Sequence, residues 1–180
     1  MEGIRTLGIC RLDARAFAPY GWMLGKPLPA AGAGTPVFSN PATDFWQEHV
    51  FDPGAGGETE VLWVNYRNAD RAVGNLEVHL LTQQAIVPLT GPVIQVVAAS
   101  GADGLPDAAT LAAFEVPVGQ GICMKPGCWH ATRIATPGEV TCLMLTRRST
   151  TADLVAHLDG REAAAESAIV SFEGCMLAPA

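Results

Sequence analysis

Hydrophobic residues recur along this chain in short runs, some alternating with polar residues and some continuous, and glycine, proline or aspartate separates most of them. Alternating or short continuous apolar runs bounded by turn residues are typical of β-strands. The runs that predict strands are Glu60–Tyr66, Leu76–Leu81, Ala85–Leu89, Val93–Ala98, Ala112–Val116, Gly121–Lys125, Ala131–Ala135 and Val140–Thr146. Such a series of short strands predicts a β-barrel or jelly roll.

Helical patterns are confined to the flanks of this strand series, apart from one competing segment at Pro106–Phe114. Leu12–Gly21 predicts a short helix with Asp13 as its N-cap, because aspartate accepts hydrogen bonds from the first free backbone N–H groups. Thr151–Leu158 and Arg161–Ala168 predict two helical segments over the outside of the barrel. Lys26–Pro41 is rich in proline, glycine and alanine and predicts a loop or an extended arm.

These elements predict one mainly β domain with short flanking helices. We expect an N-terminal arm and helix over residues 1–50, a barrel core over 58–148 and a C-terminal helical tail over 149–180. A chain of 180 residues with 49% apolar and 16% charged residues is long and apolar enough to bury a core of its own.

The formal net charge of -7 argues against nucleic acid or an anionic membrane as a partner. The beginning of the chain lacks the apolar core of a signal peptide, and no run approaches the ~20 apolar residues that span a bilayer. Five scattered cysteines without a C-x-x-C pair predict reduced thiols in a cytoplasm, acting as small buried apolar residues. Cys128 stands apart because it lies two residues before a histidine.

Four polar residues form the candidate site. Side chains alternate between the two faces of a strand, so Glu77 and His79 lie on one face, opposite the apolar face of their strand. Gln84 follows at the next turn, and His130 follows the turn at Pro126-Gly127, which returns its strand beside the first. We therefore expect these side chains to meet in the mouth of the barrel.

Three uses of this set stay open. Imidazole, carboxylate and amide oxygen of His79, His130, Glu77 and Gln84 are competent ligands for a divalent metal. A carboxylate beside a histidine also makes a general base near neutral pH. The third use is a hydrogen-bonding pocket without chemistry, and a lone histidine is often a plain structural residue.

A second group of residues has a weaker pattern. Lys125 is either solvated or binds a substrate carboxylate as a point charge. Asn65 is either an edge residue or a pocket donor, and Trp129 is core or pocket wall. Five arginines are candidate anion-binding residues, namely Arg67, Arg71, Arg133, Arg147 and Arg148, and sequence does not rank them.

The combination of Leu76-Glu77-Val78-His79, Gln84 to Leu89 and Lys125-Pro126-Gly127-Cys128-Trp129-His130-Ala131 resembles ureidoglycolate lyases. The segments Asn65-Tyr66-Arg67, Pro106 to Phe114 and Gly119-Gln120-Gly121 share this resemblance, which covers about Leu12 to Arg147. The resemblance implies a cupin-type double-stranded β-barrel, a homodimer, and the splitting of ureidoglycolate into glyoxylate and urea in purine and allantoin catabolism.

The resemblance also implies roles for the site. His130 would be the base, aided by Glu77 or His79, while Lys125 or an arginine binds the substrate carboxylate. General cupins place a histidine where this chain has Glu77 and a glutamate where it has Gln84, so we expect either no metal or a weakly bound divalent ion. The arginine that the family carries near Phe38–Trp46 is missing. A metal-dependent cupin enzyme acting on another small acid and a non-catalytic binding cupin are the alternative readings.

Overall fold

The computed structural model of the protein describes residues 5–30 and 37–178. Its strands are β1 (Arg5–Leu7), β2 (Ile9–Arg11), β3 (Gly21–Leu24), β4 (Val37–Ser39), β5 (Asp44–Trp46), β6 (Thr59–Tyr66), β7 (Ala72–His79), β8 (Gln84–Pro88), β9 (Val93–Ala98), β10 (Ala112–Val116), β11 (Gly121–Met124), β12 (Trp129–Ile134), β13 (Val140–Arg147) and β14 (Ser167–Leu177). Its helices are α1 (Ala14–Phe17), the 3₁₀ turn η1 (Ala108–Thr110) and α2 (Arg148–Leu158).

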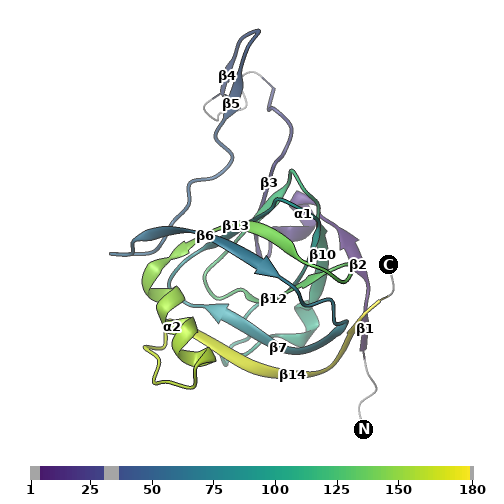
Figure 1. Ribbon diagram of the computed structural model, residues 1–180, viewed down its shortest axis with the longest axis vertical. Helices are drawn as coiled ribbons and strands as arrows, with labels where there is room; N and C mark the ends of the chain where they lie inside the picture. Colours follow the sequence, from purple (N-terminus) through teal and green to yellow (C-terminus); the bar gives the residue numbers. More distant parts are fainter. Residues whose placement is uncertain (1–4, 31–36, 179–180) are drawn as a thin grey trace.

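Two sheets form the body of the molecule (Figure 1). The larger sheet has the order β1-β14-β7-β12-β9-β10-β2, and the smaller has the order β3-β11-β8-β13-β6. An apolar core that includes Ile86, Val97, Ile122 and Met144 lies between them. The mainly β fold class with a barrel of two sheets is confirmed.

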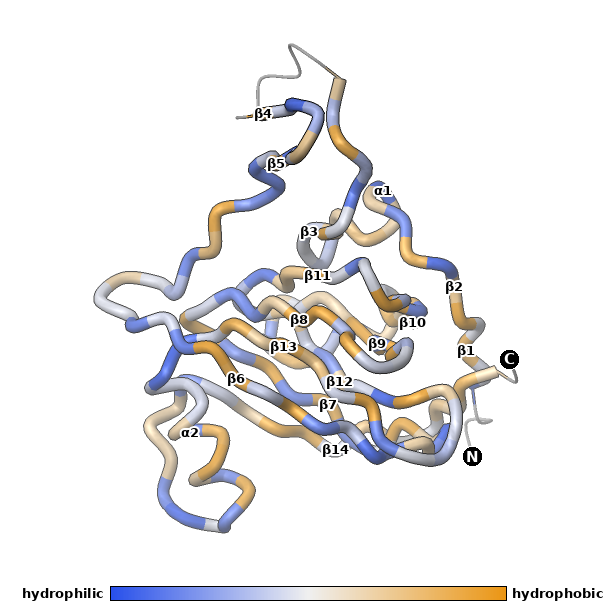
Figure 2. Tube along the Cα trace, turned by 45° about the horizontal axis from the view of Figure 1, so that its top comes forward, coloured by the Kyte–Doolittle hydropathy of each residue, from blue (hydrophilic) through white to orange (hydrophobic). Residues whose placement is uncertain are grey.

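The larger sheet curls back on itself through the first described strands. β1 pairs in parallel with β14, while β2, one residue later in the chain, pairs in parallel with β10 at the other end of the same sheet. Leu7 and Leu177 are buried on the face enclosed by this curl, together with Val78 and Trp129. The chain thus has two apolar cores, one on each face of the larger sheet, and orange segments of Figure 2 follow the strands that supply them.

The predicted strands of the barrel core all appear, with ends that differ by a few residues. Asp13 caps α1 as expected, since its side chain accepts hydrogen bonds from Arg15 N and Ala16 N. The competing helix at Pro106–Phe114 is reduced to η1, and the remainder of that segment includes β10.

The second predicted helix of the C-terminal tail is wrong. Residues 161–166 are irregular, and Ser167 begins β14, which pairs with β7 in the middle of the larger sheet. Asp153 on α2 organises this turn by accepting hydrogen bonds from Ser167 N, at 2.7 Å, and Glu166 N, at 3.0 Å. The last strand therefore belongs to the barrel and not to a helical cover.

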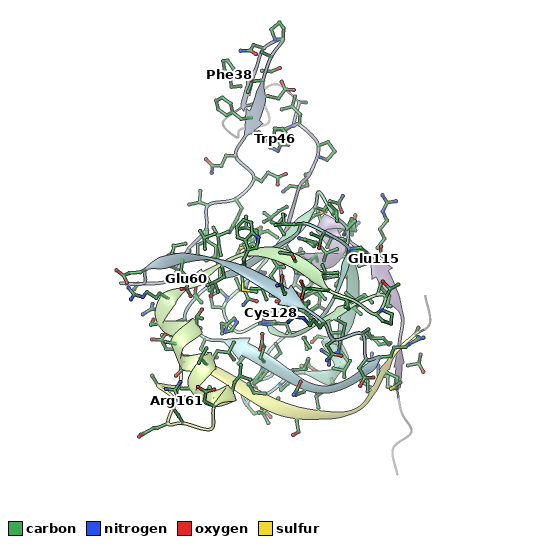
Figure 3. All side chains as sticks on the ribbon, in the orientation of Figure 1. Phe38, Trp46, Glu60, Glu115, Cys128 and Arg161 are labelled. Atoms are coloured by element: carbon green, nitrogen blue, oxygen red, sulfur yellow. The ribbon has the colours of Figure 1, made fainter. Side chains whose placement is uncertain are left out.

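A β-hairpin of β4 and β5 projects from the barrel (Figures 1 and 3). Its base is fixed by Glu48, which accepts hydrogen bonds from Gly25 N and Lys26 N and so ties the two legs together. Phe38 and Phe45 stack across the hairpin with ring centroids 5.1 Å apart. The predicted arm, Lys26–Pro41, includes β4, whereas β5 and the pairing of the two strands were not predicted. Residues 31–36 of that prediction lie outside the described residues, as do residues 1–4.

Among the helices that the structure describes, none combines the length and the apolar character that crossing a bilayer requires.

Candidate active site

Glu77 and His130 face each other across two neighbouring strands. They are the one Cα pair through which β7 and β12 are in register, and both side chains lie on the face that is directed toward the smaller sheet. His130 Nε2 lies 3.1 Å from Glu77 Oε1. His130 is buried, whereas the Glu77 side chain is one-third exposed, so the carboxylate connects the histidine with solvent.

His79 joins this pair from two residues further along β7. Its ring centroid is 5.1 Å from that of His130, and its Nε2 lies 2.8 Å from Gln84 Nε2 on β8 of the facing sheet. Burial, and secondarily the neighbouring His130, lower the pKa of His79 to about 4. His79 is therefore neutral at neutral pH.

The proton position on His130 follows from its other contact. His130 Nδ1 lies 2.9 Å from the carbonyl oxygen of Cys128. A carbonyl only accepts, so Nδ1 carries a proton, and Nε2 is the ring nitrogen that faces the Glu77 carboxylate. The turn before β12 thus sets which nitrogen is available for chemistry.

The environment keeps Glu77 ionised. Burial acts to raise the pKa of Glu77, but the hydrogen-bonding contact and charge of His130 outweigh it, and the net pKa is lowered. Cys128 has the opposite behaviour, since burial raises the pKa of its thiol to about 12. Cys128 is thus a protonated thiol at neutral pH and not an activated nucleophile.

A cavity of about 190 Å³ opens beside the pair. Its lining residues are Tyr66, Asn75, Glu77, His130, Ala131, Thr132, Arg133, Leu158 and Ile169. This volume holds a small organic acid, and the lining combines a carboxylate, an imidazole, a hydroxyl and an amide.

Arg133 lies in the seam where β7 and β12 separate beyond their single pair. Its guanidinium donates to Thr132 O at 3.0 Å and to Ala72 O at 3.2 Å, so it spans from one strand to the other. The residue is 7% exposed, and Nε has no hydrogen-bond partner among the described residues. A buried cation with an unused donor is suited to an anionic group.

The histidine cluster also fits a divalent metal. One donor atom each from Glu77, His79 and His130 lies within 4.8 Å of the others. His79 Nδ1 and Gln84 Oε1 are buried without a hydrogen-bond partner in the part of the chain that is described, and His130 Nε2 has only the Glu77 carboxylate beside it. Two imidazoles, a carboxylate and an amide oxygen form a donor set that zinc, manganese or iron accepts.

The remaining predicted site residues lie elsewhere. Lys125 Nζ donates to Ala18 O at 2.8 Å and sits 5.6 Å over the Trp22 ring. Asn65 is exposed on β6, where it accepts a hydrogen bond from Thr141 Oγ1 at 2.9 Å. The structure does not bring either residue to the histidine cluster.

Two further predicted residues also point away from the cavity. Arg67 is exposed and pairs with Glu139. Trp129 faces the second core, and its indole N–H donates to Gly104 O at 3.1 Å.

Sequence reasoning missed several polar residues on the inner faces of the sheets. Thr132 follows His130 with the strand period and donates to Gln95 Oε1 at 3.0 Å, and Tyr66 closes the cavity from the smaller sheet. Glu60 and Thr146 are partners at the other end of β6 and β13. The strand period was the available signal, because each residue shares its face with apolar core residues.

The model of the family described as ureidoglycolate lyase matches residues 4–166. The chain belongs to the ureidoglycolate lyase family. Two curated relatives, the ureidoglycolate lyases of Burkholderia mallei strains NCTC 10229 and NCTC 10247, are each 33% identical over 150 residues. Each alignment covers 81% of this chain and 84% of the relative.

Two solved structures show a weaker structural similarity to this chain. A dTDP sugar isomerase from Desulfovibrio desulfuricans G20 has a TM-score of 0.44 and 11% identity, and the match covers 84% of this chain and 85% of that one. Bacillus subtilis oxalate decarboxylase has a TM-score of 0.38 and 14% identity over 56% of this chain and 28% of that one.

Proposed function

We propose that this protein is a ureidoglycolate lyase that releases glyoxylate and urea in purine and allantoin nitrogen catabolism. The observation that carries the proposal is the buried His130 with Nε2 3.1 Å from an ionised Glu77, beside a cavity sized for a small acid, in a chain of this family. Ureidoglycolate is a carbinolamine, so its cleavage needs a proton removed from a hydroxyl and a proton delivered to a leaving nitrogen.

His130 performs both proton steps. Its Nε2 takes the hydroxyl proton as the carbonyl of glyoxylate forms and the C–N bond breaks, and it then delivers that proton to the departing urea nitrogen. Glu77 lies beside Nε2 and stabilises the imidazolium between the two steps, while the Cys128 carbonyl holds the ring orientation through Nδ1. His79 is neutral at this pH and takes no part in the proton transfer, which His130 performs.

Arg133 binds the substrate carboxylate. It is a cation of the cavity lining, and its Nε–H is buried and unused within the described chain. Lys125, the alternative expected from the sequence, already donates to two backbone carbonyls, of Ala18 and Pro19. Thr132 and Asn75 line the same end of the cavity and add neutral hydrogen bonds.

The decisive assay measures glyoxylate and urea together, with purified protein and an enzyme-free blank, because a carbinolamine also decays unaided. Equal release of both products well above the blank supports the lyase. Release equal to the blank from a folded protein supplied with divalent metal refutes it.

We further propose that Glu77, His79 and His130 can hold a divalent metal weakly, as an alternative to the metal-free proton transfer, because His130 would coordinate through the same Nε2 that acts as the base. A bound ion would then supply Lewis-acid polarisation of substrate oxygens in place of that base. Three neutral or singly charged donors from two strands favour a modest affinity that depends on their deprotonation. Metal content of the purified protein and thermal stability before and after chelation test this, and an unchanged melting temperature with no retained metal contradicts it.

A homodimer is the proposed assembly, formed through the arm and the outer face of the smaller sheet. Phe45 on the arm is 59% exposed, and Trp63 on β6 is 69% exposed beside Leu143 in register on β13. A two-stranded hairpin is not stable without packing against another surface. In a two-fold symmetric dimer the arm of each protomer packs on the smaller sheet of its partner, which covers both apolar regions at once.

Phe45→Asp and Trp63→Asp should give an 18.8 kDa monomer by light scattering, whereas Leu105→Asp, at an exposed leucine outside both surfaces, should not. A monomeric wild type contradicts the assembly.

We also propose a cytoplasmic location with no nucleic-acid or membrane partner. Its support is the net charge of -7 together with cysteines that form no disulfide in the described structure. Fractionation of the native host tests the location.

A further inference from the structure

A polar row crosses the inner face of the smaller sheet at the end that faces His79. Glu60 on β6 and Thr146 on β13 are Cα partners. The register of β13 with β8 pairs Leu145 with Ala85, so its continuation by one residue places Thr146 opposite Gln84. Figure 3 labels Glu60 near the start of β6. At this end the inner face of the smaller sheet is therefore polar and carries the row Glu60–Thr146–Gln84. Further along the same strands the inner residues are apolar.

Each member of this row presents an oxygen that is buried and unpartnered. Glu60 Oε1, Thr146 Oγ1 and Gln84 Oε1 have no hydrogen-bond partner within residues 5–30 and 37–178. Thr146 is 2% exposed and Gln84 is 5% exposed. Buried polar atoms in folded proteins almost always have a partner, so three neighbouring exceptions indicate that a polar molecule binds between them.

The chemistry of the row selects the kind of group that binds. A carboxylate oxygen and an amide oxygen only accept hydrogen bonds, and a threonine hydroxyl accepts as well as donates. The matching ligand is rich in N–H donors and carries no negative charge, because Glu60 repels an anion. A ureido group has this character.

The row also lies on the correct side of the proton-transfer pair. β7 and β12 run antiparallel through the pair Glu77 and His130, so along the strands His79 lies on one side of this pair, whereas Arg133 lies on the other side and on the opposite face of β12. Gln84 contacts His79, at 2.8 Å, and continues this side into the smaller sheet.

We propose that Glu60, Thr146 and Gln84 form the subsite that binds the ureido group of the substrate and the urea product. This proposal rests on the proposed lyase function for the identity of the ligand. The row accepts the N–H groups of the leaving urea, orients the C–N bond toward His130, and excludes ligands that carry a second carboxylate at that end.

The test compares the binding of urea and of glyoxylate to the full-length protein by saturation-transfer NMR titration. Thr146→Val removes the hydroxyl at nearly constant volume, and Glu60→Gln removes the charge at constant shape. Thr146→Ser is the matched control because it keeps the hydroxyl. Arg133→Met is the reciprocal variant at the carboxylate end.

We expect Thr146→Val and Glu60→Gln each to raise the urea dissociation constant about fivefold, the usual effect of one hydrogen bond, with the glyoxylate constant changed less than twofold. Arg133→Met should do the reverse, and Thr146→Ser should bind urea as the wild type does. KM for ureidoglycolate should rise more than kcat falls in the two row variants.

Three results overturn the subsite: no detectable urea binding to the wild type, an unchanged urea constant in both variants, or an equal loss of both ligands. The melting temperature of each variant shows whether a loss of binding is due to misfolding, and Thr146→Ser is the folded variant with which the others are compared. The proposed function fails separately, because a wild type that binds urea through the row but releases no glyoxylate above the blank keeps the subsite and loses the lyase.

Discussion

Replacing His79 by glutamine should remove a large part of the acid sensitivity of the fold. The pKa of His79 is lowered to about 4 from the ordinary 6.5, because its ring is buried and lies beside His130, although Glu77 and Asp153 partly oppose this. Below pH 6.5 the unfolded chain binds a proton at this residue while the folded chain does not. The free energy of unfolding therefore falls as the pH is lowered from 6.5 toward 4, and this contribution is fully present above pH 6.5.

The magnitude follows from the size of the shift. One pKa unit corresponds to about 1.36 kcal/mol, so His79 accounts for the loss of roughly 3 kcal/mol across this range. The side chain is buried, at 4% exposure, so solvent screening does not reduce this figure. A loss of this size is a large fraction of the stability of a typical domain.

The assay is guanidinium unfolding of the wild type and His79→Gln at about pH 8 and about pH 4.5, with a chelator present so that metal release does not contribute. The pair measured at pH 8 fixes the cost of the substitution itself, because residue 79 is neutral in both proteins there. The drop in unfolding free energy between the two pH values should be smaller in the variant by about 2 to 3 kcal/mol. Equal drops in the two proteins would refute the reasoning from burial.

Three further predictions concern catalysis, the turn before β14 and the thiols. His130→Ala should lower turnover by about 10²–10⁴, the usual share of a general acid–base residue, and unchanged turnover removes His130 from the mechanism. Asp153→Ala should destabilise the fold by about 3 kcal/mol or more, because it leaves the buried N–H groups of Glu166 and Ser167 without an acceptor, and an equal denaturation midpoint contradicts this. Iodoacetamide at neutral pH should modify the exposed Cys10 and leave the buried Cys128 unmodified until the protein unfolds, as mass spectrometry of the peptides would show.

The strand period predicted the central part of this molecule well, for a physical reason. Half-buried strands must alternate, so Glu77 and His79 were placed on one face correctly, and their approach to His130 followed from the turn at Pro126-Gly127. β14 was missed because Glu162 to Glu166 is rich in alanine, which favours a helix locally, whereas the strand that follows is stabilised by its pairing with β7.

The groups that the long side chains of Lys125 and Arg133 contact could not be predicted from the sequence. Lys125 stands next to the site motif in the chain, but its ammonium group is satisfied by carbonyls at the end of α1, a contact over more than a hundred residues that leaves no local pattern. Arg133 carries no local signal that distinguishes it from the other arginines. Its place in the seam depends on where β7 and β12 separate, which is a property of the whole sheet.

The parallel pairing of β1 with β14 has a consequence for the order of folding. The curl of the larger sheet cannot close until Leu177 is available to pair with Leu7, so during synthesis the second core stays open to water until β14 has left the ribosome. Contacts of such long sequence separation form slowly, since the entropy of closing the loop comes before the gain from pairing. The nascent chain therefore passes through a state with an exposed apolar sheet face, and chaperone binding to this protein should be strongest before β14 has paired.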